Sequence, residues 1–537
     1  MTEPTHRVGE ASWDSWGDPA HAAPLTPSQR ELIGQVLGIA PDAGLPRTPE
    51  AELRLPPGSL PPDARAALAA AVGDENVDTG AAARVRHAGG KSTPDLLRRR
   101  GGDVSDAPDA VVLPAGHDEV AAVLTACARY GVAVVPFGGG TSVVGGVEPL
   151  RGGFAAAVAL DLRRLSRLVA VDAVSRTATL QAGLRTPEAE ELLAAHGFTL
   201  GHRPQSYEYA TVGGYAATRS SGQSSAGYGR FDDMVVSLRA ATPRGTLEPG
   251  RGPSSAAGPD LRRLLLGSEG TVGVITEVTL RVHPRPQERH DEAWTFPDFA
   301  TGTAALRALA QDGVRPTLVR LSDEQETSVN AVLAGEEAAP GCLAVVTHEG
   351  GAERVAAVRE LCSDTLRRAG GTGLGPERVA HWRSGRYLAP YLRDSLLDAG
   401  VLAETLETAT TWSELHRLRD AVTDALAGAL TTPEGAAPLV LCHASHVYPE
   451  GASLYFTVAA AAGADPGGRW RAAKRAAGDA IAACGATISH HHAVGTDHRP
   501  WMEDEVGPLG VEVLRAVKDT LDPAGVLNPG KLIPERS

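Results

Sequence analysis

The stretch Pro136-Phe137-Gly138-Gly139-Gly140-Thr141-Ser142-Val143-Val144-Gly145-Gly146 is the part of this sequence that decides the fold. An apolar run at residues 132–135 leads into it and predicts a short buried strand. Glycine allows close approach of the backbone to a ligand and positive φ, so that successive N–H groups can point into one concavity. Such a concavity suits the diphosphate of a nucleotide cofactor. A plain turn is the alternative, because the chain holds 61 glycines.

The loop matches neither of two common phosphate-binding motifs. It lacks the Gly-Lys-Ser/Thr ending of a P-loop, and the dinucleotide fingerprint requires a third glycine where Val143 stands. Two further loops rich in small residues follow at 204–222 and 267–276, and the last runs directly into a β-branched strand. The alternative for residues 204–222 is an ordinary surface loop. Three such loops joined to strands indicate a large, extended ligand.

Composition limits the classes of function. A chain of 537 residues predicts two or three domains, and alternating strands and helices after residue 105 predict an α/β unit. The net charge of −14 argues against nucleic-acid partners, so any anionic ligand must be held by local arginines. Five scattered cysteines suggest neither a metal cluster nor disulfides. Without a signal pattern or a long apolar run, we expect a cytoplasmic protein, and the Ala, Arg, Gly and Pro content suggests a bacterial source.

Changes in composition divide the chain into three parts. Residues 1–104 form an N-terminal extension that is partly helical, and its basic run at 96–101 is expected to be a solvated face. Residues 105–287 form the domain with the glycine-rich loops. After His283-Pro284-Arg285-Pro286 the composition shifts, and residues 288–537 are expected to form a mixed α+β domain.

Three polar residues of the last domain are candidates for a site. Arg320 is the single charge in an apolar strand, where an edge-exposed arginine is the ordinary explanation. Arg393 precedes Asp394 and could form a local surface pair, but its planar fork also suits a phosphate. Tyr455 lies in a strand whose alternation places it opposite Leu454 and Phe456, as for many sheet-face tyrosines.

A run of three histidines, His490-His491-His492, follows Ser489. In an extended segment the outer two would share one face, with His491 opposite. The run could form a metal site together with Asp497 and His498, or it could be a chance repetition. No further Cys/His cluster has the spacing of metal ligands, so we predict no metal. Acid/base groups beside a substrate fit better, because imidazole titrates near neutrality.

The order of these motifs resembles the FAD-binding domain of the vanillyl-alcohol-oxidase/p-cresol-methylhydroxylase (PCMH) superfamily. The matching segments read P-F-G-G-G-T-S, Y-E-Y-A-T-V-G-G-Y-A-A-T-R-S-S-G, T-P-R-G and G-S-E-G-T-V-G-V-I-T. Within that superfamily the chain is most similar to the alkyldihydroxyacetonephosphate (alkylglycerone-phosphate) synthase family, over nearly its whole length. The resemblance implies an α+β fold, with a PCMH-type FAD-binding domain and a mixed α+β substrate or cap domain.

The resemblance also implies a set of residues that bind FAD. The diphosphate would be held by Pro136, Phe137, Gly138, Gly139, Gly140, Thr141 and Ser142. The rest of the cofactor would be contacted by Gln205, Ser206, Tyr207, Glu208, Tyr209, Ala210, Thr211, Thr218, Arg219, Ser220, Ser221, Glu269, Gly270, Thr271, Val272, Gly273, Val274 and Ile275. No histidine stands in the first loop, where many relatives link FAD covalently, so we expect non-covalent FAD.

The activity implied by the resemblance is a redox-neutral exchange of the acyl chain of acyl-dihydroxyacetone phosphate for a long-chain alcohol, through an adduct at flavin N5. Tyr455 and the histidine run, whose Ser-His-His-His-x-Val-Gly context matches the synthases, would transfer protons. Arg320 would lie near the flavin, and Arg393 would bind the substrate phosphate.

Two other functions stay open at this point. The ending Leu-Asn-Pro-Gly-Lys at 527–531 resembles related flavin dehydrogenases, so an FAD-dependent oxidase or dehydrogenase of a 2-hydroxy acid is one alternative. A flavin-binding protein without turnover is the other. Expected partners are the lipid substrates and a second copy in a homodimer, with peripheral contact to a membrane left open because the substrate is apolar.

Overall fold

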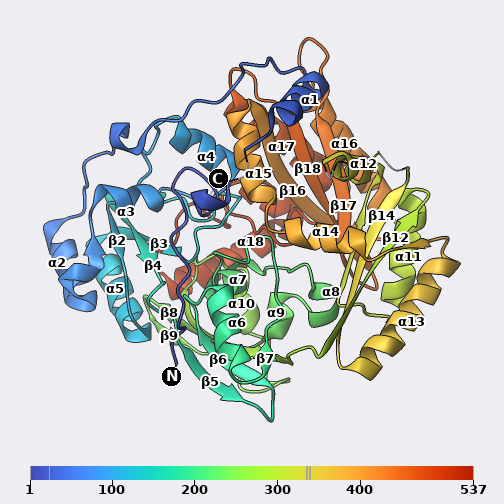
Figure 1. Cartoon of the computed structure of the whole chain (residues 1–537). Helices are drawn as coiled ribbons and strands as arrows, with labels where there is room; N and C mark the ends of the chain where they lie inside the picture. The colour runs from blue at the N-terminus through green and yellow to red at the C-terminus, as the bar shows by residue number, and fades with distance from the viewer. Residues whose placement is uncertain (1, 23, 334, 336, 338–339, 536–537) are drawn as a thin grey trace.

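The structure is a computed structural model that describes residues 2–22, 24–333, 335, 337 and 340–535. It has two lobes (Figure 1). The first lobe contains a sheet in which β4 runs parallel to both β2 and β3, and a second, antiparallel sheet. Their strand orders are β1 (Val77–Asp78), β2 (Ala110–Val112), β4 (Ala156–Asp161), β3 (Val132–Phe137), and β5 (Leu168–Asp172), β6 (Thr177–Gln181), β10 (Val274–Arg281), β8 (Val235–Thr242), β9 (Gly245–Leu247).

The helices of this lobe pack around those sheets. Helix α5 (His117–Tyr130) has the bounds that its apolar spacing predicts, and it buries Val120, Val123, Leu124 and Cys127 along one face. It packs against α2 and β8. The other elements of the lobe are α2 (Pro62–Val72), α3 (Ala81–Arg86), α4 (Thr93–Arg100), α6 (Thr186–Ala194), β7 (Phe198–Thr199), α7 (Val212–Thr218), α8 (Ser225–Tyr228), α9 (Phe231–Met234), α10 (Arg262–Leu265) and β11 (His283–Pro284).

The second lobe is built on one antiparallel sheet. Its order is β15 (Thr372–Leu374), β12 (Glu288–Phe296), β14 (Cys342–Gly350), β13 (Leu318–Ser322), β17 (Leu439–Val447), β18 (Gly451–Ala461), β16 (Val401–Thr411). The helices are α11 (Phe299–Gln311), α12 (Glu324–Leu333), α13 (Ala352–Arg368), α14 (Glu377–Gly385), α15 (Ala389–Asp398), α16 (Leu415–Leu430), α17 (Pro466–Ala483) and α18 (Met502–Leu521). One face of the sheet forms an apolar core with α11, α13, α16 and α17, which leaves the opposite face available for polar residues.

Both ends of the chain cross between the lobes. Leu37 of α1 (Pro27–Leu37) packs against Val401 and Ala403 of β16, whereas α2 and β1 belong to the first lobe. At the other end, β3 pairs with residues 526–528, called the tail below, where the Val134 N–H donates to Val526 O at 2.8 Å. One apolar cluster spans residues 64–282 with Leu527 and a second spans 294–486, while the domain bounds 1–104, 105–287 and 288–537 stay predictions.

The basic run at 96–101 is not the solvated face that its charge predicts. Arg99 and Arg100 are 0% and 1% exposed. Arg99 donates to the carbonyls of Gly89 and Gly90, and Arg100 donates to the carbonyl of Asp14 at 2.8 Å. The prediction was wrong because backbone carbonyls that reach these guanidinium groups only in the folded chain replace their water.

Among the described residues, the search for membrane spans gives a negative result: none of the helices combines the length and the apolar character needed to cross a bilayer.

Candidate functional site

The three glycine-rich loops meet at one place in the first lobe. A Cβ on Gly139 would collide with the Tyr209 carbonyl, and one on Gly138 would collide with the Thr211 hydroxyl, so the first loop packs directly on the second. Gly270 of the third loop has φ of 75° and lies against the ring of Pro136. Glycine is required at these positions because the backbones approach so closely. The three loops, which are far apart in the sequence, therefore pack together into one surface, called the cradle below.

Glu269 ties this cradle to the histidine segment. Its buried carboxylate accepts the N–H of Gly495 at 2.9 Å and that of Val494 at 3.2 Å. Asn528 of the tail donates to Glu269 O at 2.7 Å and to Gly146 O at 3.1 Å. Burial raises the pKa of Glu269 to about 7, although the two N–H groups oppose this shift. The first loop, the third loop, the tail and the histidine segment are thus held together.

Tyr455 lies on the polar face of the second sheet, as strand alternation predicts. Leu454 and Phe456 point into the core, while the ring of Tyr455 stacks on His443 of the neighbouring strand at 4.9 Å between centroids. Arg320 lies beyond His443 on the same face, and its Nη2 donates to His443 Nδ1 at 3.0 Å. Burial raises the pKa of Tyr455 to about 12, so this phenol keeps its proton at neutral pH.

Arg320 is neither edge-exposed nor unpaired. Its Nη2 also donates to Glu326 Oε1 at 2.8 Å, and Glu326 Oε1 lies 3.1 Å from His443 Nδ1. Burial alone would raise the pKa of Glu326, but the Arg320 guanidinium and His443 hold it well below its usual range. Arg320 therefore forms one buried cluster with a carboxylate and an imidazole.

The histidine run is a bend around a buried carboxylate, not the extended segment expected from the sequence. Glu407 of β16 accepts the backbone N–H of His490 at 2.6 Å, of His491 at 3.1 Å and of His492 at 2.8 Å, and the hydroxyl of Ser489 at 2.8 Å. Three successive N–H groups that converge on one anion replace the alternation of an extended chain. As a result, the rings of both His491 and His492 face Tyr455, with centroids 6.0 and 5.5 Å away.

A second group of residues fixes the protons of the histidines. Arg230 Nη1 and the Tyr448 hydroxyl lie 2.8 and 2.6 Å from His490 Nε2. A guanidinium can only donate, so His490 Nε2 is an acceptor and the ring carries its proton on Nδ1. That proton points at His491 Nδ1, 3.0 Å away, which leaves the proton of His491 on Nε2.

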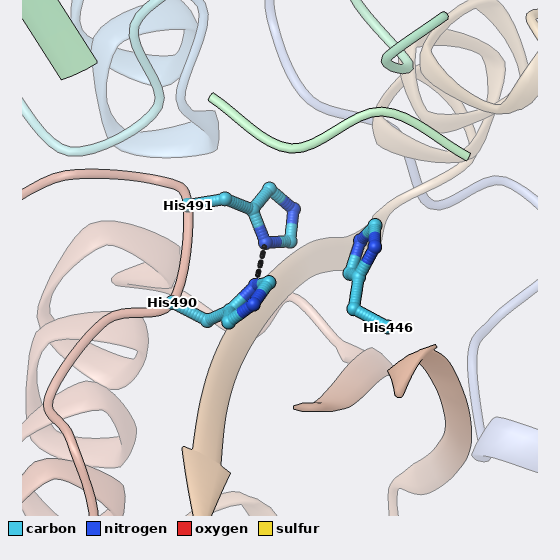
Figure 2. Close-up of side chains that lie close together, drawn as sticks. All are labelled: His446, His490 and His491. Atoms are coloured by element: carbon cyan, nitrogen blue, oxygen red, sulfur yellow. Dashed lines mark hydrogen bonds between the residues drawn. The ribbon is translucent and has the colours of Figure 1, made fainter. Parts of the chain in front are cut away.

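His446 completes a cluster of three imidazoles with His490 and His491 (Figure 2). Its ring stacks on His490 at 4.9 Å, and its Nδ1 contacts the hydroxyls of Ser225 at 2.8 Å and Ser221 at 3.2 Å. Burial lowers the pKa of all three imidazoles, so they are neutral at pH 7 and can accept a proton. One nitrogen from each lies within 4.8 Å of the others, so the group that could hold a metal ion includes His446. The metal alternative drawn from the sequence had named Asp497 and His498 beside the run.

The comparisons with known proteins cover most of the chain. Residues 108–249 match the model of the FAD binding domain, and residues 285–532 match that of the C-terminal domain of FAD linked oxidases. The alkyldihydroxyacetonephosphate synthase of Dictyostelium discoideum is 33% identical over 98% of this chain and 94% of its own length. The synthase of Trypanosoma brucei brucei is 30% identical over 99% and 93%.

The chain belongs to the alkyldihydroxyacetonephosphate synthase family. A solved structure of such a synthase superposes with a TM-score of 0.83 at 31% identity, covering 97% of this chain and 99% of the other. p-Cresol methylhydroxylase superposes with a TM-score of 0.69 at 16% identity over 91% of this chain and 98% of its own, which establishes the α+β fold class alone. The mitochondrial D-lactate dehydrogenase of Arabidopsis thaliana is 30% identical over 80% of the chain and 74% of its own length, a smaller share than the synthases cover.

One prediction from composition is contradicted by these comparisons. The two synthases that match over nearly the whole chain come from eukaryotes, so the Ala, Arg, Gly and Pro content does not support a bacterial source.

The protein is an FAD protein, and its cradle fits that cofactor. Two buried polar atoms of the loops, Gln205 Nε2 and Ser268 Oγ, and His492 Nδ1 of the histidine segment have no hydrogen-bond partner among the described residues. Unpaired buried groups are costly, and a cofactor rich in hydrogen-bonding atoms would satisfy them. The individual contacts of residues 136–142, 205–211, 218–221 and 269–275 with FAD, and its non-covalent attachment, stay proposals.

Arg393 lies close to the first glycine-rich loop, because Lys91, whose carbonyl it contacts, donates its N–H to Ser142 O at 2.7 Å. It lies on α15, where Nη2 donates to Asp394 Oδ1 at 3.2 Å and Nη1 donates to the carbonyl of Lys91 at 2.5 Å. Its Nε is buried without a partner among the described atoms. The local pair with Asp394 is therefore present, and one donor of the guanidinium is left over for a ligand.

Sequence reasoning missed the residues that hold the histidines in place. Glu407, Arg230 and the pair His446 and Tyr448 lie on three separate segments, and Arg230 is 260 positions from His490. A signal was available for Glu407, since an acid within the otherwise apolar strand at 401–408, where Glu404 is the second one, requires partners if it is buried. Arg230 and Tyr448 carry no comparable signal.

Proposed function

We propose that this protein exchanges the acyl chain of acyl-dihydroxyacetone phosphate for a long-chain alcohol, which is a step of ether lipid synthesis. The observation that carries the proposal is the group of neutral imidazoles around Tyr455, in a chain that aligns with synthases over nearly its whole length. Such an exchange consumes no electrons overall, so it requires groups that move protons rather than an electron acceptor. Bound FAD would supply the electron sink for this exchange.

In this proposal the residues of the chain divide the proton transfers between them. His491 and His492 are neutral and can take a proton from C1 of the substrate, because each ring lies against Tyr455 and is held by its backbone to Glu407. Tyr455 keeps its proton at neutral pH and can give it to the departing fatty acid. Arg320 orients His443, which stacks on Tyr455.

Arg393 is proposed as the ligand of the substrate phosphate. Its Nε is free, and it lies among other basic groups: burial and the charges of Arg99 and Arg393 lower the pKa of Lys91. An anion bound at Arg393 would relieve the repulsion between these basic groups. A phosphate that displaced Asp394 from Nη2 would receive the paired donors of the guanidinium fork.

The decisive experiment supplies the purified yellow protein with an acyl-dihydroxyacetone phosphate and an isotopically labelled long-chain alcohol, without oxygen or any electron acceptor. We expect mass spectrometry to detect the labelled ether, with no net bleaching of the flavin. Bleaching by 2-hydroxy acids without ether formation would instead favour the dehydrogenase alternative. Flavin that responds to no substrate, with Tyr455→Phe identical to the unmodified protein, would indicate a binding protein without turnover.

The partners follow from the same proposal. They are the acyl-dihydroxyacetone phosphate and the fatty alcohol, with no nucleic acid, because the chain is acidic. Cytoplasmic location, peripheral contact with a membrane and a homodimer are predictions that await measurement.

A further inference from the structure

A cavity of about 490 Å³ lies where the two lobes meet, at the end of β14 and the beginning of α13. Tyr228 of α8 and residues 283–287 of the first lobe form one wall. His348, Glu349 and Gly350 of β14 and the first turn of α13 form the other. This cavity is outside the group of residues around Tyr455.

Four arginines give the rim of the cavity a positive charge. They are Arg176, Arg285, Arg315 and Arg354, and none of them forms an ion pair within the described part of the chain. The carboxylate in the wall, Glu349, accepts the Tyr228 hydroxyl at 3.0 Å and lies 3.6 Å from Arg289. In a chain of net charge −14, four arginines without acidic partners around one cavity leave charge available for an anion.

His348 supplies the observation that points to a ligand. Its side chain is 2% exposed, and neither ring nitrogen has a hydrogen-bond partner among the described atoms. The Nε2 of His283, in the opposite wall, is also buried without a partner. A neutral imidazole carries one N–H donor, and leaving it unpaired in the interior is costly. Both rings therefore offer donors toward the cavity that nothing in the described chain uses.

The first turn of α13 adds backbone donors. The helix is 17 residues long, and its N-cap, Gly351, provides no side-chain hydrogen bond. The first N–H groups of a helix have no partner inside the helix, and its dipole favours an anion there. Glu353 in this turn is exposed, so solvent weakens its opposing charge.

We propose that this cavity is a second anion site, which binds a phosphate monoester. The arginines would neutralise the charge, and the two imidazoles and the start of α13 would supply directed hydrogen bonds. The site is separate from the proposed catalytic group, because His348 lies on the sheet face opposite to Val345, Arg320 and Tyr455. Helix α8 joins the two sites, since Ser225 contacts His446 and Tyr228 lines the cavity.

Binding of inorganic phosphate to the FAD-loaded protein tests the proposal without any turnover. Equilibrium dialysis in the Arg393→Ala background removes the proposed catalytic phosphate ligand, so that saturable binding there reports this cavity. We expect Arg176→Ala with Arg354→Ala to weaken that binding at least about tenfold. Arg368→Ala, at the far end of α13, removes one positive charge away from the cavity and should leave binding unchanged.

A second measurement follows His348 directly. In protein with ¹⁵N-labelled histidine, phosphate should shift the His348 imidazole signals, and the double arginine variant should abolish the shift. Vesicles with and without phosphatidic acid distinguish a lipid headgroup from a free phosphorylated molecule. The site is supported if the protein binds phosphate or phosphatidic acid and the double arginine variant loses that binding. The proposal is overturned if about 10 mM phosphate and phosphatidic acid vesicles both fail to bind, or if the double variant binds them as well as Arg368→Ala does.

Discussion

Glu407→Gln should release the histidine segment. The carboxylate accepts four hydrogen bonds, three of them from successive backbone N–H groups. A carboxamide keeps one acceptor oxygen, loses its charge, and turns an NH₂ group toward either one or three of these donors. A bond to a charged group contributes about 1.5–3 kcal/mol and a neutral one about 0.5–1.5 kcal/mol. In the better orientation three bonds are weakened and one is lost, which costs the segment about 6 kcal/mol.

This cost is measurable by hydrogen exchange of the amides at 490–492. At about 1.4 kcal/mol per factor of ten, their protection should fall roughly ten-thousandfold, and product formation should fall with it because the imidazoles lose their positions. Glu505→Gln is the matched control. Its exposed carboxylate binds Thr487 and Ile488 at the start of the same segment, so the histidine amides should keep their protection. Protection in Glu407→Gln within about threefold of the unmodified protein would refute the argument.

Four further predictions concern the site. Tyr455→Phe should lower kcat about 10²–10⁴-fold with the flavin content unchanged, and kcat near that of the unmodified protein would contradict proton transfer by this residue. Arg393→Ala should raise KM for the phosphorylated substrate about tenfold or more without loss of FAD; equal weakening of both would remove its assigned role. Because burial lowers the pKa of His202, His492 and His498 to about 3, against 6.5 when unfolded, their contribution to stability is complete above pH 6.5 and is lost as the pH falls toward 3. The pKa of Glu148 and Glu269 is raised to about 7, so their protonation stabilises the folded protein as the pH falls from 7 to 4.5 and opposes the loss of stability caused by the histidines. The melting temperature, measured from pH 7.5 to 3.5, should therefore fall most steeply below pH 4.5. A melting temperature that rises below pH 4.5 would contradict the assignment. Dialysis against a chelator should leave ether formation intact, because Arg230 and Tyr448 already occupy His490 Nε2; stoichiometric metal whose removal abolishes activity would favour the metal alternative.

The sequence predicted those parts of the molecule that depend on local pattern. Apolar spacing placed α5 at its observed bounds, and strand alternation placed Tyr455 opposite Leu454 and Phe456. Glycine content located the loops that form the cradle, because close approach of backbones excludes other residues there.

Features that depend on distant partners were not predictable in this way. The bend at 490–492 exists because Glu407 arrives from another strand, and residues considered alone favour an extended segment. The burial of Arg99 and Arg100 has the same origin, since the carbonyls that replace their water come from residues 14, 89 and 90. The cluster around His490 joins segments separated by up to 260 positions, which no local pattern reports.

The pairing of the tail with β3 has a consequence for the order of folding. Asn528 binds the carbonyls of Gly146 and Glu269, so these two loops are joined by contacts that span 382 and 259 positions of sequence. The entropy of the intervening chain must be lost before such contacts can form, so they form later than local ones. We therefore expect the cradle to close late in folding, and the flavin to be held firmly only after the tail has docked.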